Sequence, residues 1–222
     1  MKIAVATPHR GLVSAAWAAW VRRLEADGAA LVAGWLAFDV DVVRARNRVV
    51  GVVLRDMPDI THVLWLDDDM YPENEADGVR VVREMLATGE DMIAAPYTNK
   101  RHPLHWIHQP LQGEQPDERG VMRVRAVGFG CTVTSRSCLE MMWREAEGYW
   151  DLPHEVELRN LFGLLYDRDD QGRRYLMSED FSFCKRWRDR GGQIGIYARS
   201  GIICHEGPKS WSARDMPGGV VG

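Results

Sequence analysis

The chain has 222 residues, of which 45% are hydrophobic, and a formal net charge of −4 at pH 7. This size suffices for one sizeable core, and the negative charge argues against a surface built as a whole to attract nucleic acid. No apolar run approaches the roughly 20 residues that cross a bilayer, and the first one is too short for a signal peptide. We therefore expect a cytoplasmic protein without a membrane span, whose cysteines are reduced and mostly buried.

The first half of the chain alternates the patterns of strands and helices. Strands are predicted at residues 2–6, 30–37, 62–66 and 91–95, and helices at residues 12–26, 41–55 and 74–88. This alternation predicts an α/β fold with a mostly parallel central sheet and helices on both faces. Ligands bind beyond the carboxyl ends of such strands, so residues 7–10, 67–69 and 96–101 are the first candidates for a site.

The second half of the chain is less regular. The sequence predicts a long loop at residues 97–120, strand pairs within 121–134, and irregular chain at 147–177 with a turn at 169–172. Helices are predicted at 136–146 and 179–190, the second of them capped by Ser178, and strands at 193–197 and 200–204. No linker divides the chain, which predicts a single domain.

Three consecutive aspartates, Asp67, Asp68 and Asp69, follow the predicted strand at 62–66. Adjacent carboxylates repel one another unless a cation or hydrogen-bond donors offset their charge. Mg²⁺ and Mn²⁺ prefer oxygen ligands and often bridge to substrate phosphates. In an extended segment Asp67 and Asp69 point the same way, so this pair can share one metal ion. The alternative is a solvated acidic loop or the approach to a helix.

Two further groups of polar residues are candidates for chemistry. Glu179 and Asp180 stand in the first turn of a predicted helix. Carboxylates in that position either complement the helix dipole or, when partly desolvated, act as a general base. His205 ends the last predicted strand and is a candidate for a third ligand of the same metal ion.

A basic helix face and a pair of glycines give weaker signals. One face of a predicted helix carries Arg44, Asn47 and Arg48. This face is either exposed to solvent or binds a phosphate or a base. The glycines on either side of Phe129 permit a close backbone approach, by a ligand or by a packed strand.

Taken in order, these features resemble the GT-A glycosyltransferases, especially the small family 2-like enzymes of bacteria and phages. The matching segments are Thr7-Pro8, Arg44-Ala45-Arg46-Asn47, Asp67-Asp68-Asp69, Pro96-Tyr97 with Lys100, Gly128-Phe129-Gly130 with Arg136, Ser178-Glu179-Asp180 and His205. The resemblance extends over residues 2–207. It implies a single GT-A domain with a nucleotide-binding half at 1–96, an acceptor and catalytic half at 97–207, and a tail at 208–222.

The resemblance implies a metal-dependent, inverting transfer of a hexosyl-type sugar from a nucleotide-sugar, most often a UDP-sugar, to an acceptor hydroxyl. Asp67, Asp69 and His205 are the implied ligands of Mn²⁺ or Mg²⁺. Asp180 is the implied general base, with Glu179 in support. The residues implied to bind the nucleotide-sugar are Thr7, Pro8, Arg44, Asn47, Asp67, Asp68 and Lys100.

The acceptor is expected to be a saccharide, or alternatively a hydroxymethylated base in phage-type DNA. The residues expected on the acceptor side are Trp106, Phe129, Gly130 and Trp150. Two other functions stay open, a nucleotidyltransferase of related fold and a non-catalytic module that binds nucleotide-sugars. The chain lacks the glycine-rich phosphate loop expected of the first, and the Glu179-Asp180 pair argues against the second.

Overall fold

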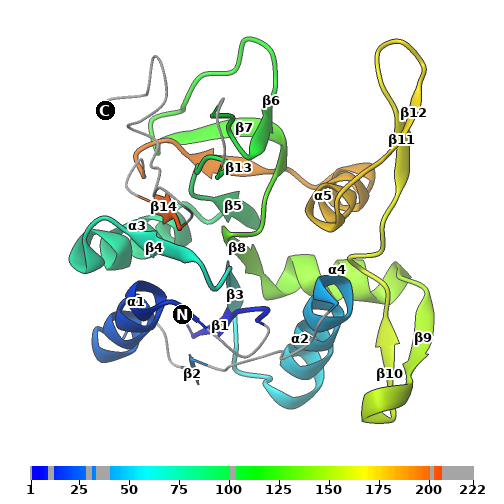
Figure 1. The fold of residues 1–222 in the computed structure, drawn as a ribbon, viewed down its shortest axis with the longest axis horizontal. Coiled ribbons are helices and arrows are strands. Elements are labelled where there is room, and N and C mark those ends of the chain that lie inside the picture. The colour runs from blue at the N-terminus through cyan, green and yellow to red at the C-terminus, as the bar shows by residue number, and fades with distance from the viewer. Residues whose placement is uncertain are drawn as a thin grey trace.

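The computed structural model describes residues 2–9, 13–28, 32–33, 41–100, 104–200 and 203–206. Its central strands are β1 (Ile3–Ala6), β2 (Val32–Ala33), β3 (His62–Leu66), β5 (Met92–Ala94), β6 (His108–Pro110), β7 (Val121–Val127), β8 (Cys131–Ser135) and β13 (Gly195–Tyr197). They form one sheet in the order β2-β1-β3-β8-β5-β13-β7-β6 (Figure 1). Most of the strand predicted at 30–37 and the whole tail at 208–222 lie outside the described residues.

The direction of the strands makes this sheet mixed. Neighbours are parallel at β1–β2, β1–β3 and β5–β13, whereas β8 is antiparallel to both β3 and β5, and β7 is antiparallel to both β13 and β6. The sequence predicts a mostly parallel sheet, and only β7 and β8 depart from the common direction among the described strands. The strands predicted within 121–134 therefore do not pair with one another but insert at two different places in the sheet.

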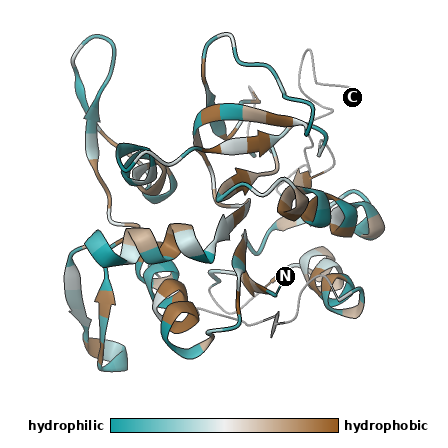
Figure 2. Ribbon diagram, turned by 180° about the vertical axis from the view of Figure 1, so that it is seen from behind, coloured by the Kyte–Doolittle hydropathy of each residue, from teal (hydrophilic) through white to brown (hydrophobic). Residues whose placement is uncertain are grey.

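Helices cover both faces of the sheet, as predicted. They are α1 (Ala15–Ala26), α2 (Val42–Asp56), α3 (Glu75–Ala87), α4 (Arg136–Glu145) and α5 (Glu179–Asp189). Figure 1 shows α1 and α3 on one side of the sheet and α2, α4 and α5 on the other. Alternate residues of a strand point to opposite faces, so Leu64 joins the core under α1 and α3 whereas Val63 and Trp65 join the core under α2, α4 and α5. Figure 2 shows hydrophobic residues concentrated on the central strands and on the helix sides that face them.

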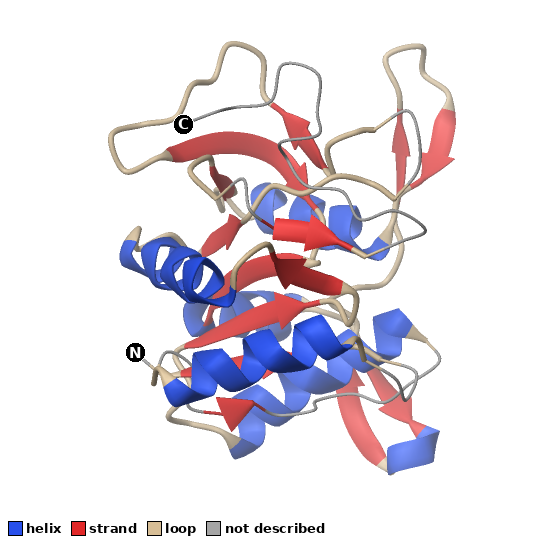
Figure 3. Ribbon diagram, turned by 60° about the vertical axis from the view of Figure 1, so that its left-hand side comes forward, coloured by secondary structure: helices blue, strands red, loops and turns tan. Residues whose placement is uncertain are grey.

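Residues 147–177 form two antiparallel hairpins, although the sequence predicts irregular chain there. The first pairs β9 (Gly148–Asp151) with β10 (Val156–Arg159) around the short 3-10 helix Leu152–His154, and the second pairs β11 (Tyr166–Arg168) with β12 (Arg174–Leu176). Their residues are mostly polar and exposed, so they lack the apolar alternation that identifies a strand. Figure 3 shows both hairpins standing clear of the central sheet.

The remaining strands form a small sheet beside the N-terminal end of α3. There β4 (Met70–Pro72) pairs antiparallel with β14 (Ile203–His205), which places His205 opposite Met70. All four cysteines are free and buried, as predicted. None of the helices in the described ranges combines the length and the apolar character that a membrane span requires.

The C-terminal end of α2 is held by an arginine from α4. The Arg136 guanidinium donates hydrogen bonds to the main-chain carbonyls of Val53, Leu54, Met57 and Ile60. Carbonyls in and after the last turn of a helix lack partners within the helix, and a cation there also suits the helix dipole. The contacts of Arg136 are therefore structural, although the residue accompanies the glycine segment in the resemblance.

We expect Arg136→Ala to lower the free energy of unfolding by about 2 to 3 kcal/mol, because several carbonyls lose a charged donor. Urea denaturation followed by circular dichroism measures this change. Arg144→Ala, at an exposed position of the same helix, is the matched control and should shift the value by no more than about 0.5 kcal/mol. Equal losses in the two variants would contradict the capping role.

Candidate functional site

One edge of the sheet collects most of the predicted site residues. β1, β3 and β5 run in the same direction, so Thr7, the aspartates at 67–69 and Thr98 follow strands that end at this edge. β8 runs the other way, so the segment 128–130 that precedes it lies at the same edge. The main-chain N–H of Asp67 donates to the Gly130 carbonyl at 3.1 Å, which joins these two segments.

A buried arginine is the centre of the site. Arg46 belongs to α2, and its side chain is 2% exposed. Its Nη2 donates to Asp67 Oδ1 at 3.2 Å, and its Nη1 donates to Glu179 Oε1 at 3.1 Å and to Asp180 Oδ1. The end of β3 and the start of α5 are therefore joined through one guanidinium.

Arg46 carries no predicted role of its own, although the sequence contains a signal for one. Arg46 precedes the buried Val49 by three residues and the buried Val50 by four, which places it on the face of α2 that packs into the core. Charged side chains are almost never fully buried unless they are paired. An arginine on a valine-lined helix face thus predicts buried carboxylate partners.

The single positive charge of the Arg46 guanidinium does not neutralise the negative charges of three carboxylates. Burial raises the pKa of Asp180, and the nearby charge of Arg46 lowers it. The carboxylates of Glu179 and Asp67 raise this pKa further, whereas a hydrogen bond from the Phe129 N–H at 3.0 Å lowers it. Together these effects give Asp180 a pKa of about 7. Burial lowers the pKa of Arg46, but the carboxylates outweigh burial and raise the pKa above its usual value, so Arg46 stays charged. A carboxylate with a pKa near 7 is suited to accept a proton at neutral pH.

Asp69 forms a second cluster with Lys100 and His205. Lys100 Nζ donates to Asp69 Oδ2, and His205 Nε2 lies 3.4 Å from Asp69 Oδ1. His205 Nδ1 lies 2.9 Å from the Thr98 carbonyl, which can only accept, so Nδ1 carries a proton. Burial raises the pKa of Asp69, but His205 and Lys100 outweigh burial and lower it. Asp69 is therefore ionised at neutral pH.

The facing atoms of Asp69 and His205 fit a shared cation. Asp69 Oδ1 is buried and accepts no well-formed hydrogen bond within the described chain. Because Nδ1 is bound to the Thr98 carbonyl, Nε2 is the ring nitrogen that faces Asp69 Oδ1, at 3.4 Å. A carbonyl behind the imidazole is the usual support of a metal-bound histidine. One or two protein ligands, completed by phosphate oxygens and water, are typical of Mg²⁺ sites.

The predicted set of three metal ligands is not assembled in this structure. Among the described residues, no three His, Cys, Asp or Glu side chains are grouped so as to hold a metal ion. Of the three predicted ligands, Asp67 is the one that does not join the others, because its carboxylate is bound by Arg46. Asp69 and His205 remain together.

Two buried hydroxyls at the same edge have no partner among the described residues. These are Thr7 Oγ1 and Thr98 Oγ1. Unpaired buried hydroxyls are rare in proteins and mark places where water or a ligand supplies the hydrogen bond. Pro8 follows Thr7 and is half-buried. Burial and the two neighbouring aspartates raise the pKa of Asp68.

Arg44 and Asn47 line a pocket that does not include Thr7. This pocket has a volume of about 350 Å³ and is lined by Asp41, Val43, Arg44, Asn47, Glu147, Gly148, Tyr149 and Asn160. Asn47 Oδ1 accepts hydrogen bonds from the main-chain N–H groups of Leu161 and Phe162, at 3.0 and 3.1 Å. The amide of Asn47 therefore ties the segment 160–162 to α2 and is committed within the protein, where the resemblance implies a contact with the nucleotide.

Phe129 and Gly130 do not present an acceptor surface, which corrects their expected role. The Phe129 ring is 0% exposed and packs against the rings of Trp65, Phe162 and Phe183. A Cβ atom on Gly130 would lie 2.8 Å from the side chain of Tyr97, whose hydroxyl accepts from the Gly130 N–H at 3.0 Å. Close packing of Tyr97 on the backbone explains this glycine.

The two tryptophans expected on the acceptor side differ in exposure. Trp150 lies on β9 and is 58% exposed. Trp106 is half-buried, and its ring centroid lies 5.6 Å from that of His108. Of the two, only Trp150 offers most of its ring to a ligand.

Comparison with known proteins supports the fold alone. No family model and no curated protein matches the chain. Among solved structures, the chain is similar to the crystal structure of A197 from STIV, with a TM-score of 0.56 and 17% sequence identity. The likeness covers 93% of this chain and 86% of that chain, so one α/β architecture accounts for nearly the whole sequence.

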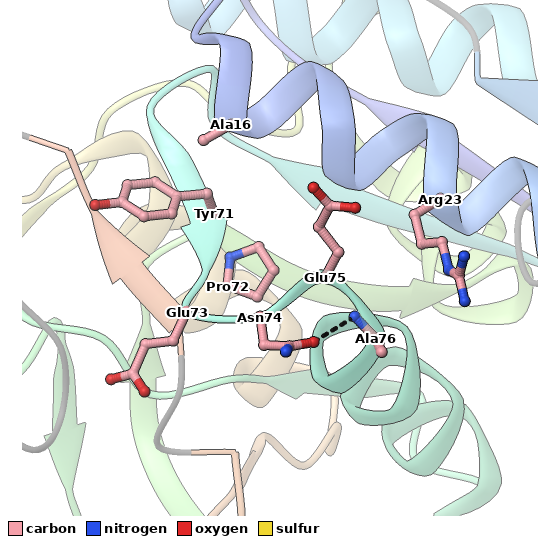
Figure 4. Close-up of a pocket in the computed structure, with 8 residues that line it drawn as sticks. All are labelled: Ala16, Arg23, Tyr71, Pro72, Glu73, Asn74, Glu75 and Ala76. Carbon is pink, nitrogen blue, oxygen red and sulfur yellow. Dashed lines mark hydrogen bonds between the residues drawn. The ribbon is translucent and has the colours of Figure 1, made fainter.

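A larger cleft, of about 600 Å³, has none of the predicted site residues in its lining. It is lined by Ala16, Arg23, Tyr71, Pro72, Glu73, Asn74, Glu75 and Ala76 (Figure 4). Asn74 is the N-cap of α3, and its Oδ1 accepts from the Ala76 N–H at 2.9 Å. Glu75 stands in the first turn of α3, where a carboxylate complements the helix dipole. Helix capping and the helix dipole account for Asn74 and Glu75.

Proposed function

We propose that the protein is a glycosyltransferase of the GT-A type, which transfers a sugar from a nucleotide-sugar to an acceptor hydroxyl with inversion. The observation that carries this proposal is the bridge made by Arg46 between Asp67, at the end of β3, and Asp180, at the start of α5. It brings a carboxylate of the acidic triplet and a carboxylate with the pKa of a general base to one place. The resemblance of the ordered motifs gives these two groups their donor-side and acceptor-side roles.

Asp180 in its ionised form takes the proton of the acceptor hydroxyl. The acceptor oxygen then bonds to the anomeric carbon, while the bond from that carbon to the diphosphate oxygen breaks on the opposite face. The electron pair of the broken bond leaves with the nucleoside diphosphate. Lys100, beside Asp69, supplies positive charge toward the departing diphosphate.

The donor is held at the same edge of the sheet. Asp69 and His205 are the proposed ligands of Mn²⁺ or Mg²⁺, which acts when bound as a Lewis acid toward the diphosphate. Thr7, Pro8 and Asp68 are proposed to line the nucleotide, which would supply the partner that the Thr7 hydroxyl lacks among the described residues. A UDP-sugar is the proposed donor.

The proposed acceptor is a saccharide, with the exposed ring of Trp150 as a stacking surface. A hydroxymethylated base in DNA is the alternative. Acceptor binding that weakens steeply with rising salt would favour DNA, because phosphate contacts release counterions.

The test is to incubate the purified protein with UDP-, GDP- and TDP-sugars, with and without Mn²⁺, and with a panel of acceptors. We expect metal-dependent release of nucleoside diphosphate from one donor, together with a glycosylated acceptor. Release of pyrophosphate would instead identify a nucleotidyltransferase. Tight metal-dependent binding of a donor that is never turned over would identify a binding module. Absence of both binding and release would refute the nucleotide-sugar proposal.

A further inference from the structure

We propose that Arg46 is a positioning residue of the reaction, which holds Asp67 and the general base Asp180 at one fixed separation. The role follows from the geometry of the guanidinium, and the identity of the reaction rests on the proposed function. Asp67 follows β3 and Asp180 begins α5, so the two carboxylates belong to separate elements. Arg46 comes from a third element, α2, and donates to both.

The shape of the side chain sets the separation. A guanidinium is planar and rigid, so its two terminal nitrogens present hydrogen bonds at a fixed spacing, which a lysine ammonium cannot do. Nη2 is bound to Asp67 and Nη1 to Asp180 and Glu179. The distance between the donor-side carboxylate and the base is therefore determined by one side-chain group.

Arg46 is itself held in place by aromatic packing. Its Cζ lies 5.3 Å from the centroid of the Phe129 ring and 5.7 Å from that of Phe162. The side chain is 2% exposed, so it has no path to an alternative partner in solvent. Catalytic groups must be held close to their productive geometry, and packing around a side chain is one way to hold them there.

Arg46 also fixes the orientation and the charge of the base. Asp180 Oδ1 accepts from Arg46 and Oδ2 accepts from the Phe129 N–H, so both oxygens of the carboxylate are held. The titratable groups that face Asp180 are Arg46, Asp67, Tyr97, Glu179 and Cys184. Arg46 is the cation among them, and it opposes the burial that favours the protonated acid.

The first arm of the test needs no turnover. The carboxyl carbon of Asp180 is followed by ¹³C NMR over a pH titration in protein labelled at aspartate, with the signal assigned from D180N. We expect a midpoint near 7 in the wild type, a midpoint raised by roughly 1 to 3 pH units in R46M, and a smaller shift in R46K, which keeps the charge. Should R46M not fold, R46K in the second arm still decides the positioning role.

The second arm measures transfer at saturating donor. We expect R46K to lower kcat on the order of 100-fold while the KM for the donor changes by less than about threefold, because a misplaced base affects the chemical step. R55K, the same substitution at an exposed position of α2, is the matched control and should match the wild type.

Each outcome of the two arms has a distinct meaning. R46K with the kcat of the wild type would overturn the positioning role, as would an unchanged Asp180 midpoint in R46M. Loss of donor binding in parallel with kcat in R46K would overturn it as well, since Arg46 would then serve the fold of the site as a whole. A shifted midpoint in R46M, with no transfer by the wild type from any donor, would reject the proposed function while confirming the control of Asp180 by Arg46.

Discussion

Asp180→Asn is expected to keep the fold and donor binding and to lose transfer, by on the order of 100- to 10,000-fold. Asparagine cannot accept the proton of the acceptor hydroxyl. Its amide oxygen can still accept from the Phe129 N–H, and Arg46 retains Asp67 and Glu179 as partners. Donor binding is measured by calorimetry, and transfer by the release of nucleoside diphosphate.

The pH dependence of transfer provides the control. The base must be ionised, so transfer by the wild type should rise with pH through a midpoint of about 7 and then level off. Glu179 raises the pKa of Asp180, so Glu179→Gln should move this midpoint to lower pH while transfer persists. Transfer by Asp180→Asn at the rate of the wild type would exclude Asp180 as the base.

The elements that could be predicted from sequence are those with a strong apolar pattern. The strand predicted at 62–66 coincides with β3, because a run of buried side chains ends abruptly at the aspartates. The hairpins within 147–177 carry no such pattern, since most of their strand residues are exposed or only partly buried. The antiparallel place of β8 depends on contacts between distant segments, which local periodicity does not contain.

The site was predictable where a residue type signals its chemistry in isolation. Asp69 and His205 are brought together, and Asp180 has an environment suited to a base. Arg46 required a different kind of inference, from a charge on a buried helix face to partners elsewhere in the chain. The amide of Asn47 accepts hydrogen bonds from the main chain of the segment 160–162. A sequence pattern cannot distinguish this structural contact from a contact with a ligand.

Asp69→Asn is expected to abolish the metal-dependent part of nucleoside diphosphate binding. The substitution removes the charge of an oxygen that faces His205 Nε2 at 3.4 Å. We expect the nucleoside diphosphate to bind the wild type at least about tenfold more tightly with Mn²⁺ than without it, and the variant equally under both conditions. Calorimetric titrations with and without Mn²⁺ measure the difference.

A second variant separates a shared cation from the ion pair that Asp69 makes with Lys100. His205→Ala leaves that ion pair intact, so it should reproduce the loss of metal dependence if Asp69 and His205 hold one cation. Asp59→Asn changes an exposed aspartate that pairs with Lys2 and precedes β3, and it should bind like the wild type. Full metal dependence in His205→Ala would reject the shared site. Asp69 would then serve as the partner that holds Lys100 toward the diphosphate, and Asp69→Asn would weaken binding to the same extent with and without Mn²⁺.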